Sequence, residues 1–318
     1  MYQSILVPLD GSTFAEYALP VAQSIAYRSK ATLQLVHVHI PLPVGYPEGV
    51  VVFNEGLETQ NKEYERTYLQ EVTKRLAAGL NVQVTSALLD GRGTIAETLN
   101  HYVKATGTDL IVMATHGRGA LTRFWLGSVA DQLVRQAERP LLLVRPPEGA
   151  EAPPNLVQEQ VFQHILIPLD GSALSEQILE HAIALGELMH ADYTLLRVVD
   201  LSMLPSYPPT SYIGLDRQLL EELQAKAQTY LDSVANRLRA QVGTPSQAPL
   251  QIQTRVVVHQ QPAVAILEEA GKDGIDLVAM ETHGWGGLTR LFVGSIADKV
   301  LRGAPKPVLI HRPQSKSP

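Results

Sequence analysis

Cysteine is absent from the 318 residues of the sequence. This absence excludes disulfide bonds, thiolate zinc sites, cysteine-bound iron–sulfur clusters and a cysteine nucleophile. Because it also fits a reducing compartment, we expect a cytoplasmic location. No run approaches about 18 consecutive apolar residues, so no membrane span is expected. The opening residues MYQSILVPLDGS lack the basic region and the long apolar core of a signal peptide.

Positive charge is in slight deficit, with 26 Lys and Arg against 32 Asp and Glu and a formal net charge of -6. A broad cationic surface for a nucleic-acid backbone is therefore not expected. Hydrophobic residues make up 45% and charged residues 18% of the sequence, which is typical of a globular protein with a buried core. Since 318 residues exceed what one core usually contains, we expect two domains.

An internal repeat is the main feature that the sequence does contain. The segment ILVPLDGSTFAEYAL from Ile5 recurs as ILIPLDGSALSEQIL from Ile165. The segment THGRGALTRFWLGSVADQLVR from Thr115 recurs as THGWGGLTRLFVGSIADKVLR from Thr282. A proline-rich and polar stretch separates the two copies, as expected of a linker. The repeat predicts a first domain over residues 1–147, a linker over 148–160 and a second domain over 161–313.

Each half alternates strand-like and helix-like segments, which is typical of βαβ units. The strands predicted in the first half are Ser4–Leu9, Leu33–Ile40, Val82–Leu88, Leu110–Thr115 and Leu141–Val144. Those predicted in the second half are Ile165–Leu169, Tyr193–Val199, Ile252–Val258, Leu277–Met280 and Val308–Ile310. The helices predicted in the first half are Phe14–Arg28, Glu58–Ala78, Thr94–Ala105 and Ser128–Gln136. We therefore predict the α/β class, with two tandem five-stranded parallel open sheets and helices on both faces of each.

Two long segments rich in Pro, Gly and Tyr follow the second predicted strand of each half. They are Pro41–Gly56 and Leu201–Leu215. Loops of this length usually form lids or contact surfaces, or are disordered.

An aspartate directly follows the first predicted strand of each half, as Asp10 and Asp170. Ligands of an open parallel sheet bind beyond the carboxyl ends of its strands, where these residues are expected. One interpretation is that Asp-Gly-Ser turns the chain and caps the next helix. The other is that the carboxylate meets a nucleotide or its magnesium ion. The residues alone leave both open.

A glycine motif follows the fourth predicted strand: His116-Gly117, nine residues, then Gly127-Ser128. Glycine lets the backbone approach a phosphate closely, and the amino end of the following helix favours an anion. Arg118 adds positive charge nearby. The alternative is a loop that only joins a strand to a helix. Neither a P-loop nor a G-x-G-x-x-G fingerprint is present.

Repeat by repeat, the chain resembles the universal stress protein family, whose fold is a five-stranded α/β domain. The ATP-binding branch of that family carries G-x-x-G-x9-G-[ST], which the first half matches with Ala114 in place of the leading glycine. The resemblance implies ATP as ligand, with Mg²⁺ reaching Asp10 through the nucleotide. The ATP-binding residues that it implies in the first half are Pro8, Leu9, Asp10, Val38, Met113, Ala114, His116, Gly117, Arg118, Gly127, Ser128 and Val129.

The second half departs further from this motif. Glu281 stands where the leading glycine would be, and Trp285 replaces Arg118. A carboxylate that faces phosphates would repel them unless it were protonated or bridged by a cation, or it could turn outward. We therefore predict that the second site is weaker or empty, with occupancy of both sites as the alternative. The corresponding residues are Pro168, Leu169, Asp170, Val198, Met280, Gly284, Gly294, Ser295 and Ile296.

His37 and His39 would share a face of one strand. Because no third ligand follows at a recognisable spacing, we interpret the pair as local packing and not as a metal site. No G-x-S-x-G elbow marks a catalytic triad, and no catalytic residue is predicted.

The resemblance implies a regulatory or signalling module in the stress response, in which ATP occupancy changes conformation or partner binding. A slow ATPase and a nucleotide-free interaction scaffold are the alternatives. Members of the family pair through their last strands, so Leu141–Val144 and Val308–Ile310 are expected to pair the two domains with each other. Whether two chains then form a homodimer stays open.

Overall fold

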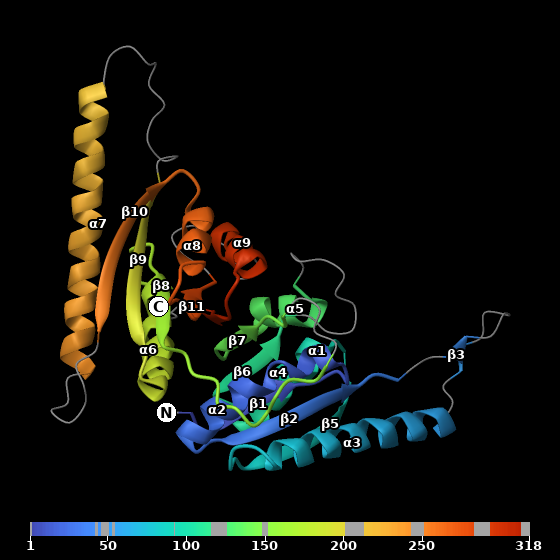
Figure 1. Ribbon diagram of the computed structural model, residues 1–318. Helices are drawn as coiled ribbons and strands as arrows, with labels where there is room; N and C mark the ends of the chain where they lie inside the picture. Colours follow the sequence, from blue (N-terminus) through green and yellow to red (C-terminus); the bar gives the residue numbers. More distant parts are fainter. Residues whose placement is uncertain are drawn as a thin grey trace. The chain divides into compact units, whose positions relative to one another are not determined.

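The computed structural model describes residues 2–41, 44–45, 51–52, 55–91, 93–115, 126–147, 152–200, 213–242, 251–282 and 293–312. The chain divides into two compact units, Met1–Val161 and Phe162–Pro318. Figure 1 labels the helices and strands of both. Each unit is a parallel sheet flanked by helices, so the predicted α/β class is confirmed.

The sheet of the first unit has the strand order β7-β6-β1-β2-β5, with every neighbouring pair parallel. Its strands are β1 (Ser4–Pro8), β2 (Thr32–His39), β5 (Val84–Asp90), β6 (Leu110–Ala114) and β7 (Leu141–Val144). Each lies within two residues of its predicted bounds. The central strand β1 is buried because helices cover both faces of the sheet.

The helices of the first unit are α1 (Thr13–Glu16), α2 (Leu19–Ser29), α3 (Glu55–Ala77), α4 (Ile95–Thr106) and α5 (Ser128–Gln136). From β1 the chain adds β2 and β5 on one side of the sheet, and then returns to add β6 and β7 on the other side of β1. Because the crossovers are right-handed, the helices before and after this return lie on opposite faces of the sheet. In agreement, Gln23 of α2 donates a hydrogen bond to the Leu76 carbonyl of α3, and α4 packs against α5.

The prediction of one continuous helix over Phe14–Arg28 was wrong. α1 ends at Glu16 and α2 begins at Leu19, with Pro20 in its first turn. Proline has no backbone N–H, and its ring would clash with the carbonyl of the residue four positions earlier, which is Glu16. Pro20 is tolerated at the start of a helix, so the chain breaks the helix before it.

The two long predicted loops are only partly described. Within Pro41–Gly56, strands β3 (Val44–Gly45) and β4 (Val51–Val52) form an antiparallel ribbon. Within Leu201–Leu215, residues 201–212 lie outside the described part of the chain, and a long helix begins at Ile213.

The second unit repeats this architecture with the strand order β12-β11-β8-β9-β10. Its strands are β8 (His164–Pro168), β9 (Asp192–Asp200), β10 (Ile252–His259), β11 (Leu277–Glu281) and β12 (Val308–His311). Its helical segments are η1 (Ser175–Gln177), α6 (Ile178–Met189), α7 (Ile213–Val242), α8 (Pro262–Ala270) and α9 (Ser295–Gly303). Ser4 faces Thr32 in the first sheet and His164 faces Asp192 in the second, so the repeat extends to strand register.

Part of the predicted linker over 148–160 packs on α2 of the first unit. The Tyr17 hydroxyl donates to the Ala152 carbonyl at 3.0 Å, and the Gln160 N–H donates to Ser24 Oγ at 2.8 Å. Arg28 forms an ion pair with Glu159. The described residues of this segment are therefore held along α2 and the turn before it, while the domain boundaries at 147 and 161 stay a prediction.

An aspartate fixes the amino end of the first strand in each unit. Asp109 Oδ2 accepts the N–H groups of Gln3 and Ser4 at 2.7 and 3.0 Å. Asp276 makes the same two contacts at the start of β8. Each carboxylate thus joins the amino ends of two neighbouring strands.

Asp109→Ala is expected to lower the free energy of unfolding of the first unit by about 1–2 kcal/mol, because two backbone N–H groups lose a charged acceptor. Urea denaturation measures the change. Asp276→Ala should have a matching effect in the second unit. An unchanged denaturation midpoint in both variants would contradict the prediction.

Candidate functional site

The candidate site lies at the carboxyl edge of the first sheet, where three segments meet. These are the turn after β1, the end of β6 and the start of α5. Because β1 pairs in parallel with both β2 and β6, the carboxyl ends of all three strands lie at one edge. This is where open parallel sheets bind ligands.

Asp10 builds the turn after β1. Its Oδ1 accepts hydrogen bonds from Ser12 N at 2.9 Å and Ser12 Oγ at 2.6 Å. Ser12 Oγ in turn accepts the Ala15 N–H at 3.2 Å and so caps α1. Gly11 has a φ of 82°, which glycine adopts without strain. Asp170 makes the same turn contacts with Ser172 in the second unit. The turn is therefore present in both units, whereas the N-cap residue provides a side-chain hydrogen bond at α1 and none at η1.

Thr115 joins the two ends of the glycine motif. Its N–H donates to the Val144 carbonyl at 2.9 Å, and its own carbonyl accepts the Gly127 N–H at 2.8 Å. The start of α5 is therefore fixed to the end of β6. His116, Gly117 and Arg118 lie outside the described residues. Thr115 was not predicted as a site residue, although Thr-His-Gly is repeated in both halves.

The amino end of α5 has no side-chain cap within the described residues. Gly127 is its N-cap residue and provides no side-chain hydrogen bond, while Ser128 is exposed and Val129 half-buried. The first backbone N–H groups of a helix have no partner within it, and the helix dipole makes this end partly positive. The acidic Asp131 in this turn is neutralised by Arg135 at 2.9 and 3.2 Å. A phosphate group suits such a helix end.

The described residues of the predicted site all lie at or near this edge. They are Pro8, Leu9, Asp10, Val38, Met113, Ala114, Gly127, Ser128 and Val129. Leu9 and Met113 are 4% and 7% exposed, so their side chains are buried beneath this edge and present little surface to a ligand. The polar groups that the described residues offer at this edge include Asp10, Ser128 and the backbone N–H groups at the start of α5.

The same elements recur in the second unit. Thr282 donates its N–H to the His311 carbonyl at 3.1 Å and accepts the Gly294 N–H at 2.8 Å. Gly294 is the N-cap of α9, and Ser295 and Ile296 behind it are exposed. The other described members are Pro168, Leu169, Asp170, Val198 and Met280, while Gly284 lies outside the described residues.

Glu281 neither turns outward nor lies exposed at the edge. It is 5% exposed, and its Oε1 lies 2.9 Å from His311 Nδ1. Burial raises the pKa of Glu281 from 4.5 to about 9, so the carboxyl group is neutral at pH 7. Of the options that the sequence left open, the structure supports the protonated one. Charge repulsion by Glu281 therefore no longer supports a weaker second site, and that prediction depends on Trp285 in place of Arg118.

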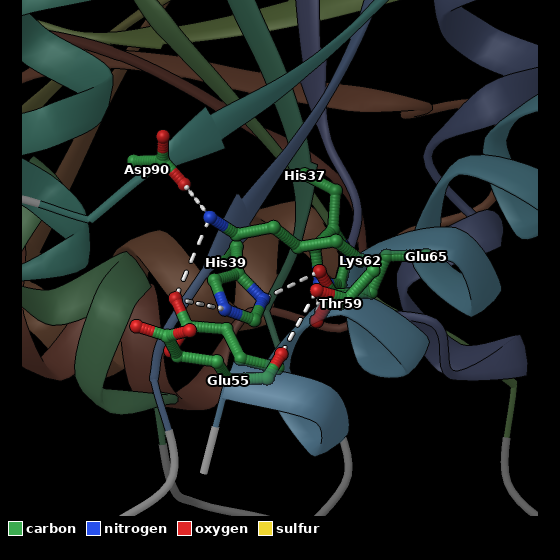
Figure 2. Close-up of polar contacts among 8 residues, drawn as sticks. His37, His39, Glu55, Thr59, Lys62, Glu65 and Asp90 are labelled. Carbon is green, nitrogen blue, oxygen red and sulfur yellow. Dashed lines mark hydrogen bonds and ion pairs between the residues drawn. The ribbon is translucent and has the colours of Figure 1, made fainter. Parts of the chain in front are cut away.

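Figure 2 shows the network around His37 and His39, which project from β2 toward α3. His39 Nδ1 lies 2.7 Å from Glu65 Oε2, and His37 Nε2 lies 3.5 Å from Glu65 Oε1. Lys62 Nζ forms an ion pair with Asp90 Oδ1 at 2.7 Å, and the hydrogen bond from Lys62 lowers the pKa of the Asp90 carboxyl group. Within the described ranges, no three His, Asp or Glu side chains are arranged to hold a metal ion.

Two α/β units in tandem, each with five parallel strands and a glycine-capped helix at the carboxyl edge, define a duplicated open-sheet protein with one candidate ligand site per unit. The family model for the universal stress protein family matches residues 1–145 and again 162–312. The chain therefore belongs to the universal stress protein family. Among the helices that the structure describes, none has the length and apolar character needed to span a bilayer.

Relatives share the tandem arrangement over nearly their whole length. The chain is 29% identical over 317 residues to a universal stress protein of Mycolicibacterium smegmatis, with 98% of this chain and 97% of the relative covered. It is 27% identical to one of Mycobacterium tuberculosis, with 97% and 96% covered. A solved universal stress protein of Archaeoglobus fulgidus has a TM-score of 0.63 at 16% identity, with 97% of this chain and 98% of that chain covered, and so shares the fold.

Proposed function

We propose that the protein binds ATP in its first unit, with Mg²⁺ held through the nucleotide, and acts as a regulatory or signalling module of the stress response in the cytoplasm. The observation that carries the proposal is the amino end of α5. Its Gly127 cap leaves the first backbone N–H groups to an incoming anion, and Thr115 holds it at the sheet edge near the Asp10 turn.

The described residues fit this ligand chemically. Phosphate oxygens accept hydrogen bonds from the backbone N–H groups of a helix amino end. Carboxylate oxygens and water are the ligands that Mg²⁺ prefers, and Asp10 supplies a carboxylate at the same edge. When bound, the ion would neutralise phosphate charge. The protein residues bind and orient the nucleotide, and the buried Leu9 and Met113 exclude water beneath it.

We also propose that the two domains pair through β7 and β12. Each of these strands ends the order of strands in its own unit. Such an edge presents unpaired backbone groups, and pairing within one chain would protect both edges from association with other molecules.

The first test compares Gly127→Glu with its matched control Gly294→Glu. A carboxylate at Gly127 would occupy the anion position of α5, so we expect ATP affinity to fall at least about tenfold, whereas Gly294→Glu should leave it unchanged. Mass spectrometry of nucleotide released on denaturation and calorimetric titration with Mg-ATP provide the readouts.

Two outcomes would contradict this proposal. A wild-type protein that neither carries nor takes up ATP in the presence of Mg²⁺ would leave an interaction scaffold whose glycine loops are structural. Loss of binding in Gly294→Glu with Gly127→Glu unaffected would assign the working site to the second unit.

A further inference from the structure

Three apolar positions of the first unit are titratable in the second. The apolar residues of the first unit are Val21, Ala114 and Val144. Their counterparts in the second are His181, Glu281 and His311. Register supports the match, because Ala114 pairs with Val144 and Glu281 pairs with His311 at the ends of corresponding strands. The second unit therefore has a titratable cluster where the first unit has apolar side chains.

The cluster is buried and compact. Glu281 Oε1 lies 2.9 Å from His311 Nδ1, and the two residues are 5% and 8% exposed. Glu281 Oε2 is buried and has no hydrogen-bond partner among the described residues. The ring of His181 on α6 lies 4.4 Å from the ring of His311, tilted by 51°. His181 is half-buried, so the chain of titratable groups runs from the interior toward the surface.

Burial disfavours charge on both members of the pair. It raises the pKa of Glu281 to about 9 and lowers the pKa of His311 below 6.5. Near neutral pH the stable form is therefore a protonated carboxyl group that donates to a neutral imidazole. Removal of this proton would place a negative charge in the interior of the unit, which is costly.

Among the described residues, charged groups near the cluster lie on α6, on η1 and in the turn after β8. On α6, Glu180 acts electrostatically on His311 and opposes part of the effect of burial. On η1, which packs against β11, Glu176 is bound by Arg237 and Tyr230. After β8, Asp170 is engaged in its own turn. Glu180 would favour charge on His311 but not on Glu281.

We propose that Glu281, His311 and His181 form a proton-binding site that couples the folding stability of the second unit to pH. The first unit lacks this site, because Val21, Ala114 and Val144 occupy the corresponding positions. The site lies next to the hydrogen bonds that hold the start of α9. The His311 carbonyl accepts the Thr282 N–H, and the Thr282 carbonyl accepts the N–H of Gly294, the N-cap of α9. Loss of the proton therefore weakens the part of the second unit that carries its glycine-capped helix.

The direction of the effect follows from proton linkage. Glu281 holds its proton more tightly in the folded unit than in the unfolded chain, so its contribution is present at low pH and is lost as pH rises from 4.5 through about 9. His311 has the opposite effect, but only below 6.5. Between pH 6.5 and 9 the contribution of this pair comes from Glu281, and it should raise the unfolding constant of the second unit by up to about tenfold per pH unit.

The full-length chain allows each unit to be followed separately, because its two tryptophans, Trp125 and Trp285, lie one in each half. In a Trp125→Phe background, fluorescence reports the second unit, and in Trp285→Phe the first. Urea unfolding at pH 6.5, 7.5 and 8.5 should show the unfolding constant of the second unit rising by about ten- to a hundredfold across the series. The first unit should not show this rise.

Two variants separate the proton site from other causes. Glu281→Gln keeps the shape but binds no proton, and Glu281→Ala with His311→Val restores two of the three residues of the first unit. Both should remove the rise between pH 6.5 and 8.5, and if the double variant does not fold, Glu281→Gln still decides. A flat wild-type profile, or an equal rise in Glu281→Gln, would overturn the proposal.

Discussion

Gly186→Ala is expected to lower the free energy of unfolding of the second unit by about 3 kcal/mol, the upper range for overpacking. A Cβ at Gly186 would lie 2.0 Å from the Tyr193 hydroxyl oxygen and 2.5 Å from Tyr193 Cζ. Tyr193 is fully buried, and its hydroxyl donates to the Ile183 carbonyl at 3.4 Å. Either the ring or α6 must move to admit one methyl group. Urea denaturation of the Trp125→Phe protein measures the loss.

The first unit supplies the matched control for this substitution. Its residues at the corresponding positions are Ala26 and Leu33, so an added methyl there is accompanied by a smaller partner. Tyr193→Leu combined with Gly186→Ala should therefore recover most of the lost stability. If the double variant is as unstable as Gly186→Ala alone, the clash with the tyrosine ring is not the cause.

Glu65→Ala should lower the free energy of unfolding of the first unit by about 2–3 kcal/mol. The Glu65 carboxylate serves both His37 and His39 (Figure 2), and these histidines are 7% and 1% exposed. Its removal takes away the hydrogen-bond partner of the buried His39 Nδ1. Urea denaturation of the Trp285→Phe protein provides the measurement.

A neighbouring glutamate on the same helix serves as control. Glu58 Oε1 lies 3.7 Å from His39 Nε2, and its side chain is 30% exposed. Glu58→Ala should therefore change the stability by less than about 1 kcal/mol. Glu65→Gln keeps an acceptor oxygen and should recover part of the loss. Equal effects of Glu58→Ala and Glu65→Ala would show that burial of the pair does not matter.

The architecture of the fold could be predicted because its signals are local and repeated. Apolar runs such as Leu110–Ala114 mark strands that are buried on both faces, and the second copy confirmed each assignment independently. The break between α1 and α2 was missed because helical spacing continues across it. Pro20 was the signal that outweighed the periodicity.

The position of the candidate site was also predictable, since strand topology alone brings Asp10 and Gly127 to one edge. The partner of Glu281 was not, because His311 is 30 residues away and meets it only through the register of β11 and β12. The depth of burial that keeps this carboxyl group neutral depends on packing by α6, which residue types at single positions do not reveal.

The segment that follows the first sheet binds back on its own unit, and this affects how the protein can be divided into fragments. Leu156 is 7% exposed, and its carbonyl lies so close to Gly79 that a Cβ there would approach it to 2.4 Å. Four residues after Leu156, the Gln160 N–H donates a hydrogen bond to Ser24 Oγ of α2. A recombinant first domain cut at residue 147 would lose these contacts with Gly79 and Ser24, whereas one extended to Val161 would keep them.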